Sequence, residues 1–330
     1  MPFLDPSEGQ VSEVRADILF RWDAAGEVDP GSDLYAIAYV RPESNRVVYE
    51  SEIAKAIKQR MEILYIANLN GRLFTEGGIL RSHYASQFRF AEDPRTELEA
   101  YPEVAAAFEA HFGLPAGHAD IRGSLQGLED LGLSPERLFT SIVPDSDFLA
   151  AFGQTFKRIG GVFIVNYDLP ALIARYRPDA NVFVLCARRT TAGDSFYAEL
   201  NRSIYEAIIS RPDTPLLFGA ELEGLGWEAM VRRTYHVSTG RLMAMLDMSE
   251  FVFVEPTRRL DVAATPLGRA LVEGQGLPAE LLRAAKRRQL CRVAPPGKDP
   301  AALVYLPHAC AGLDAGAMAA VFARAEPWLD

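Results

Sequence analysis

The chain has 330 residues, of which 49% are hydrophobic and 24% are charged, a composition typical of a globular protein with a sizeable core. Its 34 Lys and Arg residues against 44 Asp and Glu residues give a net charge of −10, which argues against nucleic acid as a partner because nucleic-acid-binding surfaces are basic. No run approaches the roughly 20 apolar residues of a membrane span, and the first residues lack the pattern of a signal peptide, so we expect a cytoplasmic protein with no membrane partner.

The first fifty residues have the pattern of a short sheet. Strand-type runs lie at 14–22, 34–40 and 46–49, and turn-forming residues fill 29–32 and 42–45. Short strands that follow one another with turns between them predict an antiparallel β-meander.

Residues 51–158 have the apolar spacing of helices. Apolar side chains recur every three or four positions over 53–64, which predicts the first helix. Asp93 followed by Pro94 is a typical helix start and Gly113 a typical helix end, so a further helical region is predicted between them.

Between Gly160 and Pro256, apolar runs of the strand type alternate with helical segments. The runs span 162–165, 182–186, 215–218 and 251–254. This alternation predicts an α/β fold with a mainly parallel central sheet over about 160–256, flanked by helices. A mixed sheet that also includes the N-terminal strands is the alternative.

The remaining chain is predicted to form helices and a pair of short strands. Helices begin at Thr265 and Leu277, the strands lie near 290–293 and 303–305, and a last helix covers 314–325. We place a domain boundary near residue 120. It separates residues 1–120, with the β-meander and helices, from the α/β domain at 121–330, and a single domain is the alternative.

Polar residues directly follow the predicted strands. Asn166 and Asp168 follow the first run, Arg188 and Arg189 the second, and Glu255 the fourth. Because the carboxyl ends of parallel strands meet at one edge of a sheet, we expect these side chains to share a site. Asp168 and Glu255 are candidates for a general base, and helix capping is the alternative role of Asp168.

The segment from Arg188 to Ser195 is a candidate anion site between a strand and a helix. Guanidinium groups of Arg188 and Arg189 and the backbone N–H groups of a strand-to-helix turn favour a phosphate or carboxylate. The remaining candidates for this contact are Thr190, Asp194 and Ser195. The alternative is that Asp194 or Ser195 caps the helix while the arginines are solvated or form salt bridges. No Walker loop or dinucleotide fingerprint is present, so the sequence identifies no cofactor.

A second cationic segment surrounds His236. Arg232, Arg233 and Arg241 are predicted to bind an anionic substrate, and His236 is the third catalytic candidate because histidine is the residue type most often used to move protons near neutral pH. The alternative is a network of salt bridges between these arginines and nearby acidic residues, which are Glu221, Glu223 and Glu228.

Signals for other sites are weaker. Gly77 and Gly78 precede Arg81 and His83, which resembles a helix-start anion site. No metal site is predicted, because a pair such as the one at 308–310 supplies only two of the three or four ligands that zinc needs.

These patterns predict an enzyme of the transferase or hydrolase type that acts on a small phosphorylated or carboxylate molecule. In this hypothesis the arginines bind the anion, and Asp168, His236 or Glu255 moves a proton. The alternative is a non-catalytic assembly subunit or a ligand-sensing regulatory protein whose loop at 232–241 binds an acidic partner. A homo-oligomer is left open.

Overall fold

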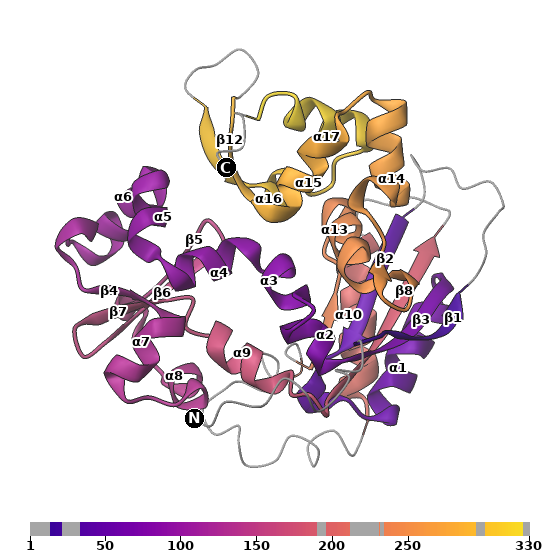
Figure 1. Ribbon diagram of the computed structural model, residues 1–330, viewed down its shortest axis with the longest axis horizontal. Helices are drawn as coiled ribbons and strands as arrows, with labels where there is room; N and C mark the ends of the chain where they lie inside the picture. The colour runs from indigo at the N-terminus through magenta and orange to yellow at the C-terminus, as the bar shows by residue number, and fades with distance from the viewer. Residues whose placement is uncertain are drawn as a thin grey trace, which may run out of the picture.

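The largest sheet of the computed structural model has five strands, in the order β1-β3-β8-β2-β9, and every neighbouring pair is antiparallel (Figure 1). The residues that the structure describes are 14–21, 34–189, 196–211, 231, 234–294 and 301–325. The strands of the large sheet are β1 (Asp17–Arg21), β2 (Leu34–Val40), β3 (Glu62–Asn70), β8 (Asn181–Arg189) and β9 (Tyr235–Val237).

Helices cover both faces of the large sheet. β2 is buried at all seven positions, and its alternate side chains enter two different cores. Those with even numbers pack with α1 (Val47–Lys58) and α10 (Phe196–Ile209). Those with odd numbers face α13 (Arg241–Phe251), on the side of the sheet where the short helices α2 (Gly71–Thr75) and α3 (Ile79–His83) also lie.

The prediction of a mainly parallel central sheet is wrong. The run at 182–186 lies in β8, which pairs antiparallel with β3 and β2, whereas the run at 162–165 lies in a different sheet. The run at 251–254 is split between the end of α13 and the start of a hairpin, and the run at 215–218 is outside the described residues. A strand buried on both faces is continuously apolar in either kind of sheet, so the pattern could not distinguish the two.

The smaller sheet has the order β4-β7-β6-β5 and contains the one parallel pair of the described residues, β4 with β7. Its strands are β4 (Ile121–Gly123), β5 (Phe148–Ala151), β6 (Gln154–Ile159) and β7 (Val162–Val165). Aromatic residues of α4 (Ala85–Glu92) and α6 (Pro102–Phe112) enter the core beneath it. The nearby helices are α5 (Pro94–Ala100), α7 (Ser124–Leu131), α8 (Pro135–Thr140) and α9 (Leu169–Arg175).

The predicted N-terminal β-meander is also wrong. Two of its three strands exist as β1 and β2, but β1 pairs with β3 and not with β2. The third predicted strand, at 46–49, is the start of α1, because the helix-forming residues that follow override three β-type residues. The predicted first helix ends at Lys58, earlier than expected, and the apolar residues from Ile63 onward belong to β3.

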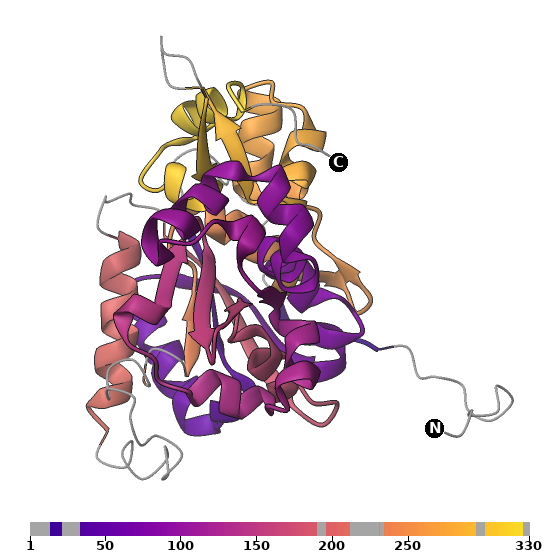
Figure 2. The same cartoon turned by 90° about the vertical axis from the view of Figure 1, so that its left-hand side faces the viewer.

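The C-terminal predictions of helices and strands are confirmed. Thr265 caps α14 (Pro266–Arg269), and Asp314 caps α17 (Ala315–Phe322). The other α-helices and β-strands of this region are α15 (Ala279–Arg287), α16 (Leu306–Ala309) and two antiparallel hairpins, β10 (Phe253–Glu255) with β11 (Arg258–Arg259) and β12 (Leu290–Val293) with β13 (Ala302–Tyr305). Figures 1 and 2 show the segment from α14 to α17 at one end of the molecule.

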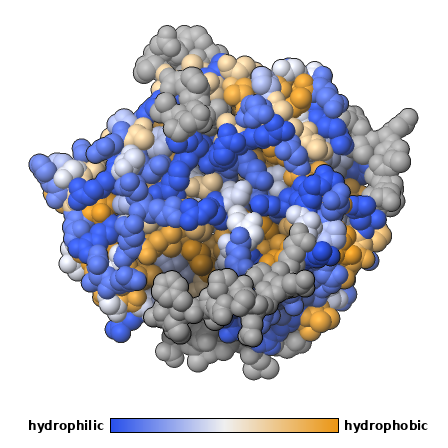
Figure 3. All heavy atoms as spheres, viewed as in Figure 1, coloured by the Kyte–Doolittle hydropathy of each residue, from blue (hydrophilic) through white to orange (hydrophobic). Residues whose placement is uncertain are grey.

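The surface in Figure 3 is hydrophilic over most of one face, with hydrophobic residues gathered in a hollow left of its centre. Within the described parts of the chain, no helix has the length and apolar character needed to cross a membrane.

Candidate metal centre

Two histidines and an aspartate from three separate elements meet inside the molecule. His83 is the last residue of α3, His236 is the middle residue of β9, and Asp247 lies within α13. The distance from His83 Nδ1 to Asp247 Oδ1 is 3.5 Å, and that from His236 Nε2 to Asp247 Oδ2 is 3.0 Å. One potential ligand atom of each residue lies within 4.8 Å of the corresponding atoms of the other two. We call this candidate site the metal centre.

The pleat of the large sheet places His236 in this cluster. Tyr235 and Val237 enter the core beneath α1 and α10, so the residue between them points to the opposite face, toward α13. In the register of β2 and β9, His236 is opposite Tyr39. The two rings stack with centroids 4.8 Å apart and an interplanar angle of 17°, which fixes the orientation of the imidazole.

Asp247 is held in place by a hydroxyl group that is itself fixed by the sheet. Ser238 Oγ donates a hydrogen bond of 2.6 Å to Asp247 Oδ2, and the same hydroxyl oxygen accepts one of 3.0 Å from the backbone N–H of Ile37. The Asp247 side chain is fully buried. Its other oxygen, Oδ1, has no hydrogen-bond partner among the described residues. A buried polar atom without a hydrogen-bond partner lowers the stability of the fold by roughly 1–3 kcal/mol.

Two of the three groups in the metal centre, His83 and Asp247, have pKa shifts that suit a cation. Burial lowers the pKa of His83 to about 4, and attraction to Asp247 offsets only part of this decrease, so the ring is neutral at neutral pH. Burial raises the pKa of Asp247, but the charge and hydrogen bond of His236, with further help from His83 and Ser238, outweigh burial and bring it below its ordinary value. Metal ions require neutral imidazole and ionised carboxylate.

The spacing of the three residues is close to that of a coordination sphere. Ligand atoms about 2.1 Å from a tetrahedral zinc ion are about 3.4 Å from one another. The two histidine-to-aspartate distances, 3.5 Å to Asp247 Oδ1 and 3.0 Å to Asp247 Oδ2, lie on either side of this value, and they end on different oxygens of the carboxylate. The two ligand atoms that are farthest apart are at most 4.8 Å from each other. They therefore have to approach by no more than about 1.4 Å to bind one ion.

Tyrosines and a cation surround the metal centre. Tyr84 contacts His83 edge to face, with ring centroids 4.6 Å apart. Burial raises the pKa of Tyr84, while the charge of Arg41 lowers it and the charge of Asp168 raises it further. Burial has the largest effect on the pKa values of Tyr39 and His83, raising the first and lowering the second. The charge of Arg41 lowers both. A positive charge therefore acts on the metal centre from the end of β2.

A second buried carboxylate, Glu250, ties α13 to its neighbours. Its Oε1 accepts a hydrogen bond of 2.5 Å from Ser82 Oγ and lies 2.8 Å from Lys286 Nζ, and its Oε2 lies 2.5 Å from Arg259 Nη1. Burial raises the pKa of Glu250, and the two cations and the hydroxyl group oppose that increase. This cluster joins α13 to α3, α15 and β11 and so fixes the helix that carries Asp247.

The predicted site residues do not share one edge, because β7, β8 and β10 belong to three different sheets. Arg188 is buried and pairs with Glu62 at 2.9 Å, and Arg189 lies over the ring of Phe196 at 5.2 Å. Glu255 is exposed and accepts a hydrogen bond of 2.5 Å from Arg258.

Asn166 and Asp168, by contrast, lie at the start of α9. Asn166 is buried with a φ of 51°. Its side-chain oxygen accepts a hydrogen bond from the backbone N–H of Thr155, and its side-chain NH₂ group donates to the backbone carbonyl oxygen of Gln87 and to Gln154 Oε1. The polar atoms of this side chain are therefore used within the protein. Asp168 is exposed, makes no side-chain capping bond, and acts electrostatically on Tyr84.

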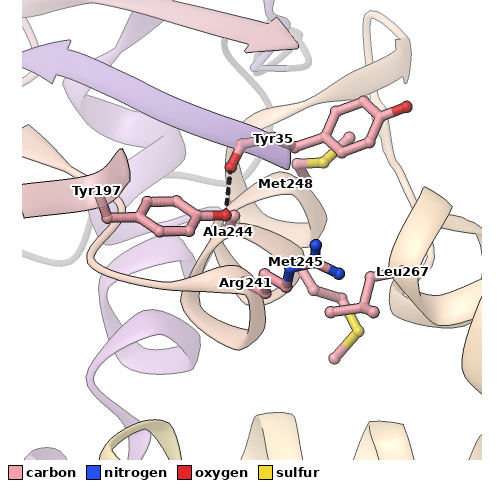
Figure 4. Close-up of a pocket in the computed structure, with 7 residues that line it drawn as sticks. All are labelled: Tyr35, Tyr197, Arg241, Ala244, Met245, Met248 and Leu267. Atoms are coloured by element: carbon pink, nitrogen blue, oxygen red, sulfur yellow. Dashed lines mark hydrogen bonds between the residues drawn. The ribbon is translucent and has the colours of Figure 1, made fainter. Parts of the chain in front are cut away.

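Of the candidate site residues in the second cationic segment, the structure describes His236 and Arg241. Arg241 is the first residue of α13 and lines a cavity of about 10 Å³, the size of one water molecule (Figure 4). The hydrogen bond in Figure 4 runs from Tyr197 to the carbonyl oxygen of Tyr35. The predicted site residues outside the described part of the chain are Thr190, Asp194, Ser195, Arg232 and Arg233.

Sequence reasoning identified His236, considered His83 only for an anion site, and missed Asp247. One signal could have found Asp247, because it is an ionisable residue within the apolar helical run 242–251. A carboxylate on a buried helix needs a partner, and histidine is the natural one to look for. Which histidines meet it depends on tertiary contacts that the sequence does not reveal.

Comparisons of the chain with protein-family models, with curated proteins and with solved structures find no match. The metal centre is therefore interpreted from its own geometry and chemistry.

Proposed function

We propose that this protein is a metal-dependent enzyme of the hydrolase or transferase type, in which His83, His236 and Asp247 bind a divalent transition-metal ion. The observation that carries the proposal is Asp247 Oδ1, a buried carboxylate oxygen that lacks a hydrogen bond among the described residues and lies 3.5 Å from a ring nitrogen of His83. A cation between these atoms satisfies the oxygen and uses the lone pair of the neutral imidazole.

The donor set supports a catalytic metal ion. Two imidazole nitrogens and a carboxylate oxygen suit Zn²⁺, Fe²⁺, Co²⁺ or Mn²⁺. Structural zinc sites use four protein ligands, whereas catalytic sites use three and keep a position for water or substrate. A metal ion of this kind lowers the pKa of bound water to about 7 and so supplies a nucleophile at neutral pH. The His236 side chain, 13% exposed, is the most open part of the metal centre.

The residue types Ser238, His236 and Asp247 also invite comparison with a serine hydrolase triad, but their hydrogen bonds are in the wrong order. In such a triad the histidine accepts the proton of the serine hydroxyl, and the aspartate contacts only the histidine. Here Ser238 donates directly to Asp247 Oδ2, the oxygen that His236 also contacts. Ser238 therefore orients the carboxylate, as residues around a metal ligand commonly do.

The small anionic substrate inferred from the sequence stays part of the proposal. Its support at the metal centre is the positive charge of Arg41, which acts on His83, Tyr39 and Tyr84. Carboxylate and phosphate groups are the substrate groups that a metal ion and an arginine bind together. The alternative of a non-catalytic protein stays a prediction, since two arginines of its binding loop, Arg232 and Arg233, are outside the described residues.

The test is an activity screen with controlled metal content. The protein is stripped with a chelator, reloaded with Zn²⁺, Co²⁺, Mn²⁺ or Fe²⁺, and assayed on a panel of phosphate and carboxylate esters. We expect one metal ion per chain and at least one activity that chelation removes and metal restores. Failure to bind any of the four ions, or an activity that persists unchanged in chelator, contradicts the proposal.

A further inference from the structure

A pocket of about 510 Å³ lies between α3, α4 and the end of α15. Four arginines line it, and we call it the arginine pocket: Arg81, Arg89, Arg287 and Arg288. Ser82 also lines it and is the residue before His83, so the pocket and the metal centre are neighbours along α3. Its volume is within the range of about 300–1,000 Å³ that is usual for small-molecule sites.

The acidic partners of the arginine pocket balance only part of its charge. Arg81 forms a two-point ion pair with Glu92, with N–O distances of 2.9 Å and 2.5 Å. Arg89 Nε lies 3.4 Å from Glu97, a carboxylate whose pKa is raised by burial and lowered in part by the charges of Arg89 and Arg288.

No ion pair is formed by Arg287 or Arg288 within the ranges of the chain that the structure describes. Four guanidinium groups and two carboxylates thus leave about two positive charges, in a chain whose overall net charge is −10. A local excess of positive charge in an acidic protein favours an anionic ligand.

One wall of the arginine pocket is apolar. Phe88 is 94% buried beneath it, and the guanidinium carbon of Arg81 lies 5.1 Å from the centre of the Phe88 ring. Ala85 and Gly78 add further lining without polar side chains. A ligand that fills this pocket therefore combines an anionic group with a small apolar part.

We infer that the arginine pocket binds a phosphorylated small molecule, with its phosphate near Arg287 and Arg288 and its apolar part against Phe88. A phosphate monoester carries close to two negative charges at neutral pH, which matches the excess charge of the pocket. The planar guanidinium group presents two parallel N–H donors to phosphate oxygens. This inference goes beyond the proposed metal-dependent function and does not depend on it, because none of the three metal-centre residues lines the pocket.

Calorimetric titration of phenyl phosphate into the full chain tests the inference. A chelator is present throughout, so the result is independent of the metal centre. We expect the double variant Arg287→Ala/Arg288→Ala to bind phenyl phosphate at least about tenfold more weakly than the unmodified chain. The control is Arg177→Ala, which removes a side chain that is 70% exposed and pairs with Asp179 elsewhere on the surface, and its affinity is expected to be unchanged.

Two further measurements make the experiment specific. The variant Arg287→Lys/Arg288→Lys keeps the charge but loses the planar donors, so we expect an affinity between those of the double alanine variant and the unmodified chain. Inorganic phosphate is expected to bind more weakly than phenyl phosphate, because it lacks a part that contacts Phe88. Absence of phenyl phosphate binding at millimolar concentration, or equal affinity in the double alanine variant and the Arg177→Ala control, overturns the inference.

Discussion

Replacement of Asp247 by Asn is expected to lower the affinity for Zn²⁺ and Co²⁺ by more than about 100-fold while the protein stays folded. Asn has the shape of Asp, and its amide oxygen still accepts hydrogen bonds, but it lacks the negative charge of a metal ligand. Changes to residues that only orient a ligand typically cost about 10–100-fold, and loss of a ligand itself costs more. Affinity is measured by competition with a chromophoric chelator, and folding by circular dichroism.

Two further variants serve as comparisons for Asp247→Asn, one with a smaller expected loss of affinity and one with none. Ser238→Ala removes the 2.6 Å hydrogen bond that orients the Asp247 carboxylate, and an affinity loss of about 10–100-fold is expected. His118→Ala removes an exposed histidine on another part of the surface and is expected to leave affinity unchanged. If Asp247→Asn binds metal as tightly as His118→Ala does, the assignment of Asp247 as a ligand is wrong.

Replacement of Glu250 by Gln is expected to lower the free energy of unfolding by about 2–4 kcal/mol. Glu250 is 1% exposed, and the change leaves Lys286 and Arg259 beside a neutral amide. Breaking a buried ion pair on one side typically costs about 3–5 kcal/mol. The expected loss is smaller because the side chains of Lys286 and Arg259 are 21% and 31% exposed and keep some contact with water.

The matched control for Glu250 is Glu255→Gln. Glu255 also pairs with an arginine, Arg258, but both side chains are exposed, at 59% and 64%. Exposed ion pairs contribute little to stability, so this change is expected to leave the unfolding curve essentially where it is. Chemical denaturation of the two variants in parallel measures the difference. Equal stability of the two would show that the Glu250 cluster does not hold α13 in place.

Local signals in the sequence predicted local structure well. Asp93 accepts a hydrogen bond from the backbone N–H of Thr96 at the start of α5, and Gly113 ends α6 with a φ of 66°. Asp314 caps α17 in the same way as Asp93 caps α5. These features depend on a few neighbouring residues, so the sequence contains what is needed to predict them.

The arrangement of the sheets could not be predicted, because strand direction depends on contacts between distant segments. β8 pairs with β2 and β3, which come more than a hundred residues earlier, and both pairings are antiparallel. The shared edge expected for Asp168, Arg188 and Glu255 depended on parallel strands and is absent for that reason.

One of the three residues of the candidate site could be selected from the sequence, and the other two could not. His236 was selected as a histidine in a cationic segment, and the structure places it in the metal centre. Asp247 and His83 are 164 positions apart, and neither has a neighbour in sequence that forms a metal-binding motif with it. Only the packing of α3 and β9 against α13 brings the three together.

Anomalous diffraction from crystals grown with Co²⁺ tests the central claim most directly. Data collected above and below the cobalt absorption edge locate the ion independently of any assumed ligands. We predict one strong peak about 2.0–2.2 Å from His83 Nδ1, His236 Nε2 and the carboxylate of Asp247. A peak at other residues, such as the exposed His308, with none between these three side chains, would contradict the assignment of a metal centre.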